Sequence, residues 1–104
     1  MDTLTRLEHT IAERRTADPA SSYVAQLSSR GTPVMARKLG EEAVEACVAA
    51  LSGSREELVG EAADVLFHLM VLLADKDIAL ADVMTELDRR EGVSGLDEKA
   101  SRSA

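Results

Sequence analysis

Hydrophobic residues recur every three or four positions along most of the chain, which is the spacing of one buried face of a helix. Leu4, Leu7 and Ile11 begin this pattern, and the alternation typical of strands is missing from the sequence. We therefore expect an all-α protein. The predicted helices cover residues 3–15, a short segment that Ser21 or Ser22 caps and Gly31 ends, residues 32–52, residues 54–75, and a segment from Leu80 that stops at Gly92.

Local signals mark the starts of the two longest helices. Thr32 precedes Pro33, which predicts Thr32 as the N-cap and proline as the first helical residue. Ser54 and Glu57 match a capping box, in which each side chain satisfies a backbone N–H group of the other residue. Because only a short turn separates these two helices, they should lie antiparallel. The expected fold is a helical bundle with two long central antiparallel helices and shorter flanking helices.

The length of 104 residues suits one domain. We expect a single all-α domain over residues 1–91 and a mobile tail over residues 92–104, which are rich in serine and small polar residues. The core must be aliphatic, because the chain has no Trp, one Phe and one Tyr. The fourth predicted helix is apolar on nearly all sides after Ala62, and so few helices cannot cover it. A homodimer that completes a four-helix core is therefore expected.

Charge and hydropathy argue against several classes of protein. The formal net charge is −7, and the last 64 residues carry fifteen acidic and six basic side chains. This balance, with so few aromatic rings for base stacking, argues against nucleic-acid binding. The longest apolar stretch, residues 62–74, is too short and too polar to span a membrane. The first 15 residues lack the apolar segment of a secretory signal, so a cytoplasmic location is expected.

Four of the acidic residues share one spacing on the two long helices. Glu42 and Glu45 are three positions apart on the first, and Glu61 and Asp64 are three positions apart on the second. In an antiparallel pair these carboxylates can converge from facing surfaces. Hard oxygen ligands of this kind suit Mg²⁺ or Mn²⁺. A di-iron site would need Glu-x-x-His on two helices, and that motif is missing from the sequence.

Simpler interpretations stay open for several of these side chains. The acidic residues of the third helix could form a solvated face with Lys38 as an ion-pair partner. His68, one turn after Asp64, could orient a carboxylate from behind or could be a satisfied core histidine. Asp75 is expected to be solvated, and Cys47 is expected to be a small core residue.

The stretches around the carboxylates resemble the all-α nucleoside-triphosphate pyrophosphohydrolases (MazG-like). Residues 38–45 read Lys-Leu-Gly-Glu-Glu-Ala-Val-Glu and residues 61–69 read Glu-Ala-Ala-Asp-Val-Leu-Phe-His-Leu, which match the Glu-Glu-x-x-Glu and Glu-x-x-Asp signature of that group. Within it, the segments 22–31 and 89–96 are also similar to the phosphoribosyl-ATP pyrophosphohydrolase family. The resemblance extends over nearly the whole chain.

The resemblance implies Mg²⁺-dependent hydrolysis of the α,β-phosphoanhydride of phosphoribosyl-ATP, which gives phosphoribosyl-AMP and pyrophosphate in histidine biosynthesis. It also implies a dimer whose subunits share the site. Two alternatives stay open: a house-cleaning pyrophosphohydrolase of noncanonical nucleoside triphosphates, and a non-catalytic helical assembly module.

The resemblance also assigns expected roles to individual residues. The metal ligands, which are also the expected catalytic residues, are Glu42, Glu45, Glu61 and Asp64. Glu45 is the candidate acceptor of the proton from the attacking water. The candidate phosphate contacts are Lys38, Arg30, Arg37, Arg89 and Arg90, and the residues expected to support the ligands are His68 and Glu41.

Overall fold

The computed structural model describes residues 2–102, and every regular element in that range is an α-helix. The all-α prediction is confirmed. The helices are α1 (Thr3–Arg14), α2 (Tyr23–Arg30), α3 (Thr32–Ser52), α4 (Arg55–Asp75), α5 (Leu80–Arg90) and α6 (Gly95–Arg102). Within the described range, none of these helices is long and apolar enough to cross a membrane.

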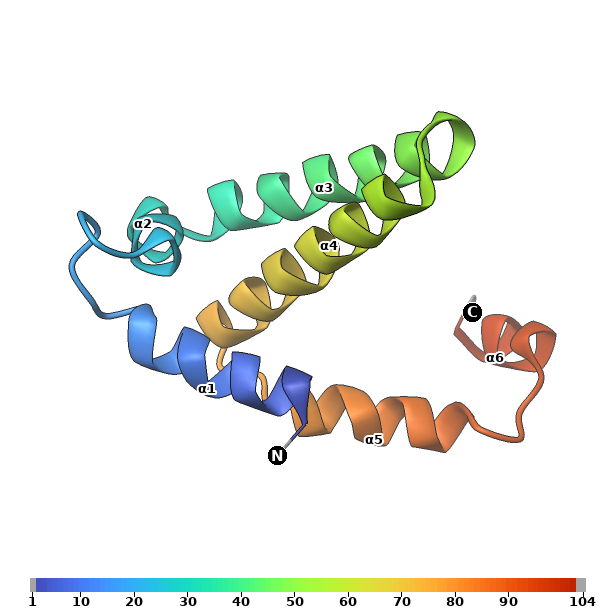
Figure 1. Cartoon of the computed structure of the whole chain (residues 1–104). Coiled ribbons are helices and arrows are strands. Elements are labelled where there is room, and N and C mark those ends of the chain that lie inside the picture. Colours follow the sequence, from blue (N-terminus) through green and yellow to red (C-terminus); the bar gives the residue numbers. More distant parts are fainter. Residues whose placement is uncertain (1, 103–104) are drawn as a thin grey trace.

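The two longest helices, α3 and α4, form the antiparallel hairpin that the sequence predicts (Figure 1). The capping box at the start of α4 is also confirmed. The Ser54 hydroxyl accepts a hydrogen bond from the backbone N–H of Glu57 at 3.2 Å, and the Glu57 carboxylate accepts one from the backbone N–H of Ser54 at 3.4 Å. Both bonds hold the chain in the tight turn where α3 reverses into α4.

The start of α3 differs from the prediction. Gly31, with φ of 90°, is the N-cap, and Thr32 is already helical with Pro33 in the first turn. The Thr32 hydroxyl is therefore not used as a cap and donates to the carboxylate of Asp75 at the end of α4. The expectation that Asp75 is merely solvated was wrong, because this carboxylate ties the open end of the hairpin together.

The core lies at the open end of the hairpin, where α1 and α2 pack against α3 and α4 (Figure 1). It is aliphatic, as the composition predicts. The buried side chains that form it are Ile11, Val24, Leu27, Met35, Met70 and Val71.

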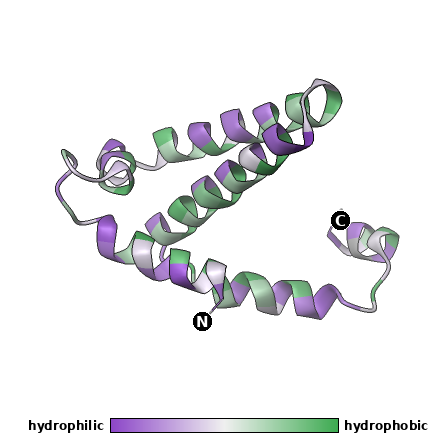
Figure 2. Ribbon diagram, viewed as in Figure 1, coloured by the Kyte–Doolittle hydropathy of each residue, from purple (hydrophilic) through white to green (hydrophobic). Residues whose placement is uncertain are grey.

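The turn end of the hairpin carries apolar side chains that no other described helix covers. Val44, Val48 and Leu51 of α3 are exposed, and the side chain of Leu51 is 89% exposed. Figure 2 shows hydrophobic colouring along much of α4 as well. Val59 and Leu66 of α4 are also exposed. Cys47, expected in the core, is exposed in the single chain, because it lies in this uncovered half of α3.

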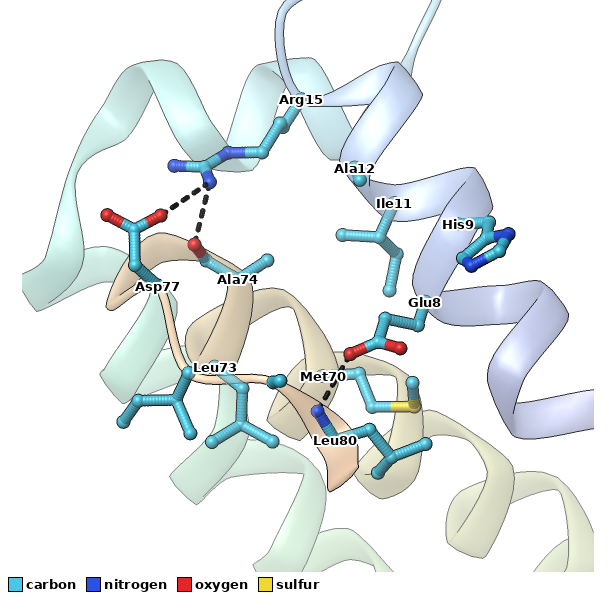
Figure 3. A pocket seen from close by; sticks show the side chains of 12 residues that line it. Glu8, His9, Ile11, Ala12, Arg15, Met70, Leu73, Ala74, Asp77 and Leu80 are labelled. Atoms are coloured by element: carbon cyan, nitrogen blue, oxygen red, sulfur yellow. Dashed lines mark hydrogen bonds and ion pairs between the residues drawn. The ribbon is translucent and has the colours of Figure 1, made fainter. Parts of the chain in front are cut away.

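Three polar contacts hold the end of α4, the following turn and the start of α5 against α1 and its C-cap Arg15, and one of them is the ion pair between Arg15 and Asp77 at 3.8 Å (Figure 3). Arg15 Nη1 donates to the backbone carbonyl of Ala74 at 2.7 Å, and the Glu8 carboxylate accepts from the backbone N–H of Leu80 at 2.7 Å. They border a cavity of about 370 Å³ lined mainly by apolar side chains, among them Ile11 and Met70. Beyond it, α5 extends away from the α3–α4 hairpin (Figure 1).

A sixth helix, α6, lies within residues 92–104, the segment expected to be a mobile tail. Ser94 explains its start, because the Ser94 hydroxyl accepts a hydrogen bond from the backbone N–H of Asp97 at 3.1 Å, in the manner of an N-cap. Ser94, one of the serines that suggested a mobile tail, is therefore also a signal for the start of a helix.

Candidate metal centre

Three of the four predicted ligands converge between α3 and α4. Glu42 and Glu45 lie one turn apart on α3, and Glu61 faces them from α4. One carboxylate oxygen from each residue lies within 4.8 Å of the other two. The i, i+3 spacing and the antiparallel hairpin together produce this acidic cluster, as the sequence predicts.

Two oxygen atoms of the cluster lack a partner. Glu42 Oε2 and Glu61 Oε2 are buried and accept no hydrogen bond from any residue in the range 2–102. Buried polar atoms are nearly always hydrogen-bonded, since an unpaired one costs the free energy of its lost hydration. A cation between the carboxylates would satisfy both oxygens, so the residues present fit a hard divalent metal ion.

The electrostatics of the cluster agree with that fit. Burial raises the pKa of Glu42 above its ordinary value, and the neighbouring carboxylates of Glu45 and Asp64 raise it further. The pKa of Glu61 is raised in the same way, first by burial and then by Glu45 and Glu42. Without a cation, the folded chain therefore opposes ionisation at both positions.

Asp64 lies next to the cluster without joining it. Among residues 2–102, its carboxylate is not one of the three that come within 4.8 Å of each other. Its side chain is exposed on α4, one turn after Glu61, and its charge still contributes to the raised pKa values of Glu42 and Glu61. Asp64 is thus placed at the solvent side of the cluster.

His68 contacts the backbone of Asp64 and not its carboxylate. The side chain of His68 is buried, with Nδ1 2.8 Å from the carbonyl oxygen of Asp64 and Nε2 3.3 Å from the hydroxyl of Tyr23. Tyr23 was not singled out from the sequence as a site residue. A tyrosine next to a capping serine carries no signal of a contact with a histidine 45 residues later.

The predicted cationic residues fall into three places. Lys38 and Arg37 both form ion pairs with Glu41, at 3.4 Å and 3.5 Å. The Glu41 carboxylate is therefore directed to these two cations. Arg30 lies exposed in the last turn of α2. The remaining two candidates, Arg89 and Arg90, lie on α5.

On α5, the Glu86 carboxylate forms ion pairs with both arginines. Its carboxylate accepts hydrogen bonds from Arg89 at 2.8 Å and from Arg90 at 3.0 Å. These bonds lower the pKa of Glu86 to about 2. Within one chain, α5 extends away from the hairpin, so these arginines are not brought to the acidic cluster by their own subunit (Figure 1).

The raised pKa of Glu42 predicts how the metal-free protein responds to pH. A carboxyl group with a higher pKa in the folded chain favours folding only while it is protonated. That contribution is present below the ordinary value of 4.5 and is lost as pH rises through the folded value. Glu42→Gln removes the ionisation, so the variant should melt at a higher temperature than wild type in EDTA at about pH 7. The difference should shrink as pH falls toward about 4, as thermal melts across this range would show.

Glu56→Gln provides the matched control, because Glu56 lies exposed in the first turn of α4 and outside the cluster. It should give no gain in melting temperature. Comparing variants with wild type is necessary because Glu86 has the opposite effect, stabilising the fold at neutral pH and losing this contribution as pH falls toward about 2. A Glu42→Gln protein that melts no higher than wild type in EDTA would contradict the prediction.

Comparison with known proteins assigns the chain to a family. Residues 4–91 match the family model described as phosphoribosyl-ATP pyrophosphohydrolase. The chain belongs to the phosphoribosyl-ATP pyrophosphohydrolase family. The matched range includes every residue of the acidic cluster, together with Tyr23, His68 and the cationic candidates.

Relatives in the phosphoribosyl-ATP pyrophosphohydrolase family are similar over nearly their whole length. A phosphoribosyl-ATP pyrophosphatase of Erythrobacter litoralis is 65% identical over 102 residues, covering 98% of each chain. One of Novosphingobium aromaticivorans is 62% identical, covering 96% of this chain and 94% of the relative. One of Dinoroseobacter shibae is 58% identical, covering 98% of this chain and all of the relative. The family resemblance inferred from the sequence motifs is confirmed.

Proposed function

We propose that the chain hydrolyses the α,β-phosphoanhydride of phosphoribosyl-ATP and releases pyrophosphate and phosphoribosyl-AMP, a step of histidine biosynthesis. The observation that carries the proposal is the acidic cluster, in which Glu42 and Glu61 each present a buried oxygen without a partner. Family membership supports the choice of substrate, since the relatives are named phosphoribosyl-ATP pyrophosphatases. We place the enzyme in the cytoplasm, where soluble nucleotide substrates occur.

Glu42, Glu45, Glu61 and Asp64 would hold Mg²⁺, or Mn²⁺ in its place. The bound ion would supply positive charge to the phosphate oxygens and make a water molecule more acidic. Of the four residues, Glu45 is the proposed proton acceptor. It is more exposed than Glu42 and Glu61, and it keeps one oxygen at the cluster. A carboxylate at the open side can accept a proton from water and pass it to solvent.

The cations beside the cluster would bind the phosphate groups. Lys38 and Arg37 lie on the same helix as Glu42, and both are paired with Glu41 at distances of at least 3.4 Å. Such loose, partly exposed ion pairs contribute little to stability, so they can exchange Glu41 for a phosphate oxygen at small cost. Arg30 would act as a further contact from the end of α2.

We also propose that the enzyme is a homodimer in which two α3–α4 hairpins form a four-helix core. The exposed residues Val44, Val48 and Leu51 lie at helical spacing on α3, and Val59 and Leu66 extend the apolar surface over α4. Contiguous apolar surfaces of this kind mark interfaces in soluble proteins. A partner seated here would border the acidic cluster, because Val44 and Val48 line the same groove as Glu45 and Glu61. Arg89 and Arg90 could then reach the substrate only from the partner subunit.

Incubation with phosphoribosyl-ATP and Mg²⁺ should release pyrophosphate and phosphoribosyl-AMP in equal amounts. EDTA should stop the release, because the carboxylates alone would repel a polyphosphate. Measuring pyrophosphate directly, with a panel of noncanonical nucleoside triphosphates assayed in parallel, separates the proposed enzyme from a house-cleaning hydrolase. Faster turnover of the panel than of phosphoribosyl-ATP would contradict the proposed substrate.

Millimolar Mg²⁺ should also raise the melting temperature of the chain, because an ion that binds only the folded state stabilises it by mass action. A non-catalytic assembly module whose acidic residues form an interface predicts no such shift. The thermal measurement therefore separates that alternative from the metal-dependent enzyme without any substrate.

A further inference from the structure

Two side chains outside the acidic cluster connect α2 to the cluster's edge. His68 is only 5% exposed and uses both ring nitrogens. Its Nδ1 lies 2.8 Å from the carbonyl oxygen of Asp64, and its Nε2 lies 3.3 Å from the hydroxyl of Tyr23. Nothing in the proposed reaction so far uses Tyr23.

The partners fix where the protons lie in the neutral imidazole. A backbone carbonyl can only accept, so Nδ1 of His68 carries the hydrogen that it donates to Asp64. Nε2 is then an acceptor, and the Tyr23 hydroxyl donates to it. The hydroxyl thereby selects the one neutral tautomer of His68 that can hold the Asp64 carbonyl.

Tyr23 is 48% exposed, and its position is set by the start of α2 and by the ring of Phe67. It is the first residue of α2, directly after Ser22, whose buried hydroxyl caps the helix by accepting from the backbone N–H of Ala25 at 3.2 Å. Its ring stacks on that of Phe67, with centroids 6.0 Å apart and planes 17° apart. Phe67 also meets the ring of His68 edge-on, at 5.1 Å and 88°. With these contacts the imidazole has one orientation and little freedom to rotate.

The carbonyl that His68 holds belongs to the turn of α4 that presents Glu61 and Asp64. In a continuous helix this carbonyl also accepts the backbone N–H of residue 68, so the side chain adds a second donor to the same oxygen. Because its carbonyl oxygen accepts two hydrogen bonds, this turn of α4 is less free to shift when the charge of the cluster changes. The geometry of the metal ligands is therefore supported from α2 as well as from α4.

We propose that Tyr23 is a positioning residue for the acidic cluster, acting through His68 on the turn that carries Glu61 and Asp64. The inference rests on the proposed function, because it treats that cluster as the metal site. Partners that orient metal ligands typically change metal affinity about 10- to 100-fold when removed, and Tyr23 acts one contact further out. Removing its hydroxyl should therefore weaken metal binding about 3- to 10-fold.

The test is a titration of the intact chain with Mn²⁺ alone, followed by electron paramagnetic resonance, for wild type and Tyr23→Phe. The phenylalanine keeps the ring that stacks on Phe67 and loses only the donor to His68. We expect the Mn²⁺ dissociation constant to rise about 3- to 10-fold, and the Mg²⁺ concentration for half-maximal pyrophosphate release to rise in parallel. The rate at saturating Mg²⁺ should fall much less.

Glu8→Leu is the matched control. Like Tyr23, Glu8 contacts another helix through one polar side-chain group, here by accepting the backbone N–H of Leu80 at 2.7 Å, and neither residue belongs to the α3–α4 hairpin that carries the cluster. If the Tyr23 hydroxyl served only to stabilise the fold, both variants would melt earlier and both would keep the wild-type Mn²⁺ dissociation constant. That result would overturn the proposal.

A double-variant cycle tests the route through His68. Asparagine in place of His68 keeps a donor near the position of Nδ1 and has no counterpart of Nε2, so Tyr23 loses its partner. Tyr23→Phe should therefore have no further effect on Mn²⁺ binding in the His68→Asn background. If Tyr23→Phe still raised the Mn²⁺ dissociation constant about 3- to 10-fold in that background, Tyr23 would not act through His68.

The outcomes also separate this inference from the proposed function. A wild-type chain that binds Mn²⁺ and releases pyrophosphate, with a Tyr23→Phe variant indistinguishable in metal affinity, refutes the positioning role alone. A wild-type chain that neither binds Mn²⁺ nor is stabilised by Mg²⁺ refutes both.

Discussion

Glu61→Gln is expected to lower kcat/KM for pyrophosphate release by at least about 100-fold, the scale on which enzymes lose activity when a group that stabilises transition-state charge is removed. Glu61 is the only residue of α4 in the three-carboxylate group found among residues 2–102, and its Oε2 is buried without a partner. Glutamine keeps the shape of the side chain and removes the charge that would hold the proposed cation. Asp64→Asn should also abolish release, because a cation at the cluster would draw in the neighbouring carboxylate.

Circular dichroism and thermal melts decide whether such a loss is specific. Without metal, Glu61→Gln should fold and melt no lower than wild type, since the raised pKa of Glu61 shows that its charge opposes folding. The stabilisation by Mg²⁺ should vanish. Glu56→Gln, the same change on the exposed first turn of α4, should keep both the activity and the stabilisation. Turnover that survives in Glu61→Gln would refute the metal site.

Val48→Asp is expected to convert the enzyme from a dimer to a monomer. Val48 lies 56% exposed between Val44 and Leu51 on the apolar surface of the hairpin. Across a two-fold axis the substitution would bury two unpaired carboxylates, one from each subunit. We expect the dissociation constant of the dimer to rise at least about 100-fold, equivalent to about 2.7 kcal/mol. Sedimentation or light scattering would report the mass, which is 11.1 kDa for one chain.

The control for this variant is Leu96→Asp. Leu96 is 82% exposed, but it lies on α6 and not on the hairpin. It should leave the dimer intact. Wild-type protein that sediments as a single chain, or dissociation caused by Leu96→Asp and not by Val48→Asp, would contradict the proposed interface. Loss of pyrophosphate release together with the dimer would indicate that the subunits share the site.

The sequence predicted those features that depend on periodicity and local capping. Helical spacing placed α3 and α4, the Ser54–Glu57 box fixed the turn between them, and the i, i+3 pattern then brought Glu42, Glu45 and Glu61 together. These features are local, or they follow from one short connection, so a single sequence contains them.

Features that depend on contacts between distant segments were predicted poorly. Thr32 had the residue type of an N-cap, yet its hydroxyl is bound by Asp75, 43 positions later, and Gly31 supplies the cap. The contact between Tyr23 and His68 is likewise invisible until α2 is docked on α4. Cys47 had a helical neighbourhood typical of a core, but the uncovered half of the hairpin leaves it exposed.

The contact between Thr32 and Asp75 has a consequence for the register of the two long helices. Together with the short turn between the helices, it fixes α3 and α4 relative to one another at both ends, and the acidic cluster lies between these two points. Sliding one helix past the other by a turn, about 5.4 Å, would break the contact at the open end. The three carboxylates repel one another, but the Thr32–Asp75 contact and the turn keep the two helices from moving apart. The fold therefore keeps these three carboxylates in alignment without a cation, so that a cation binding there would not also have to order the helices.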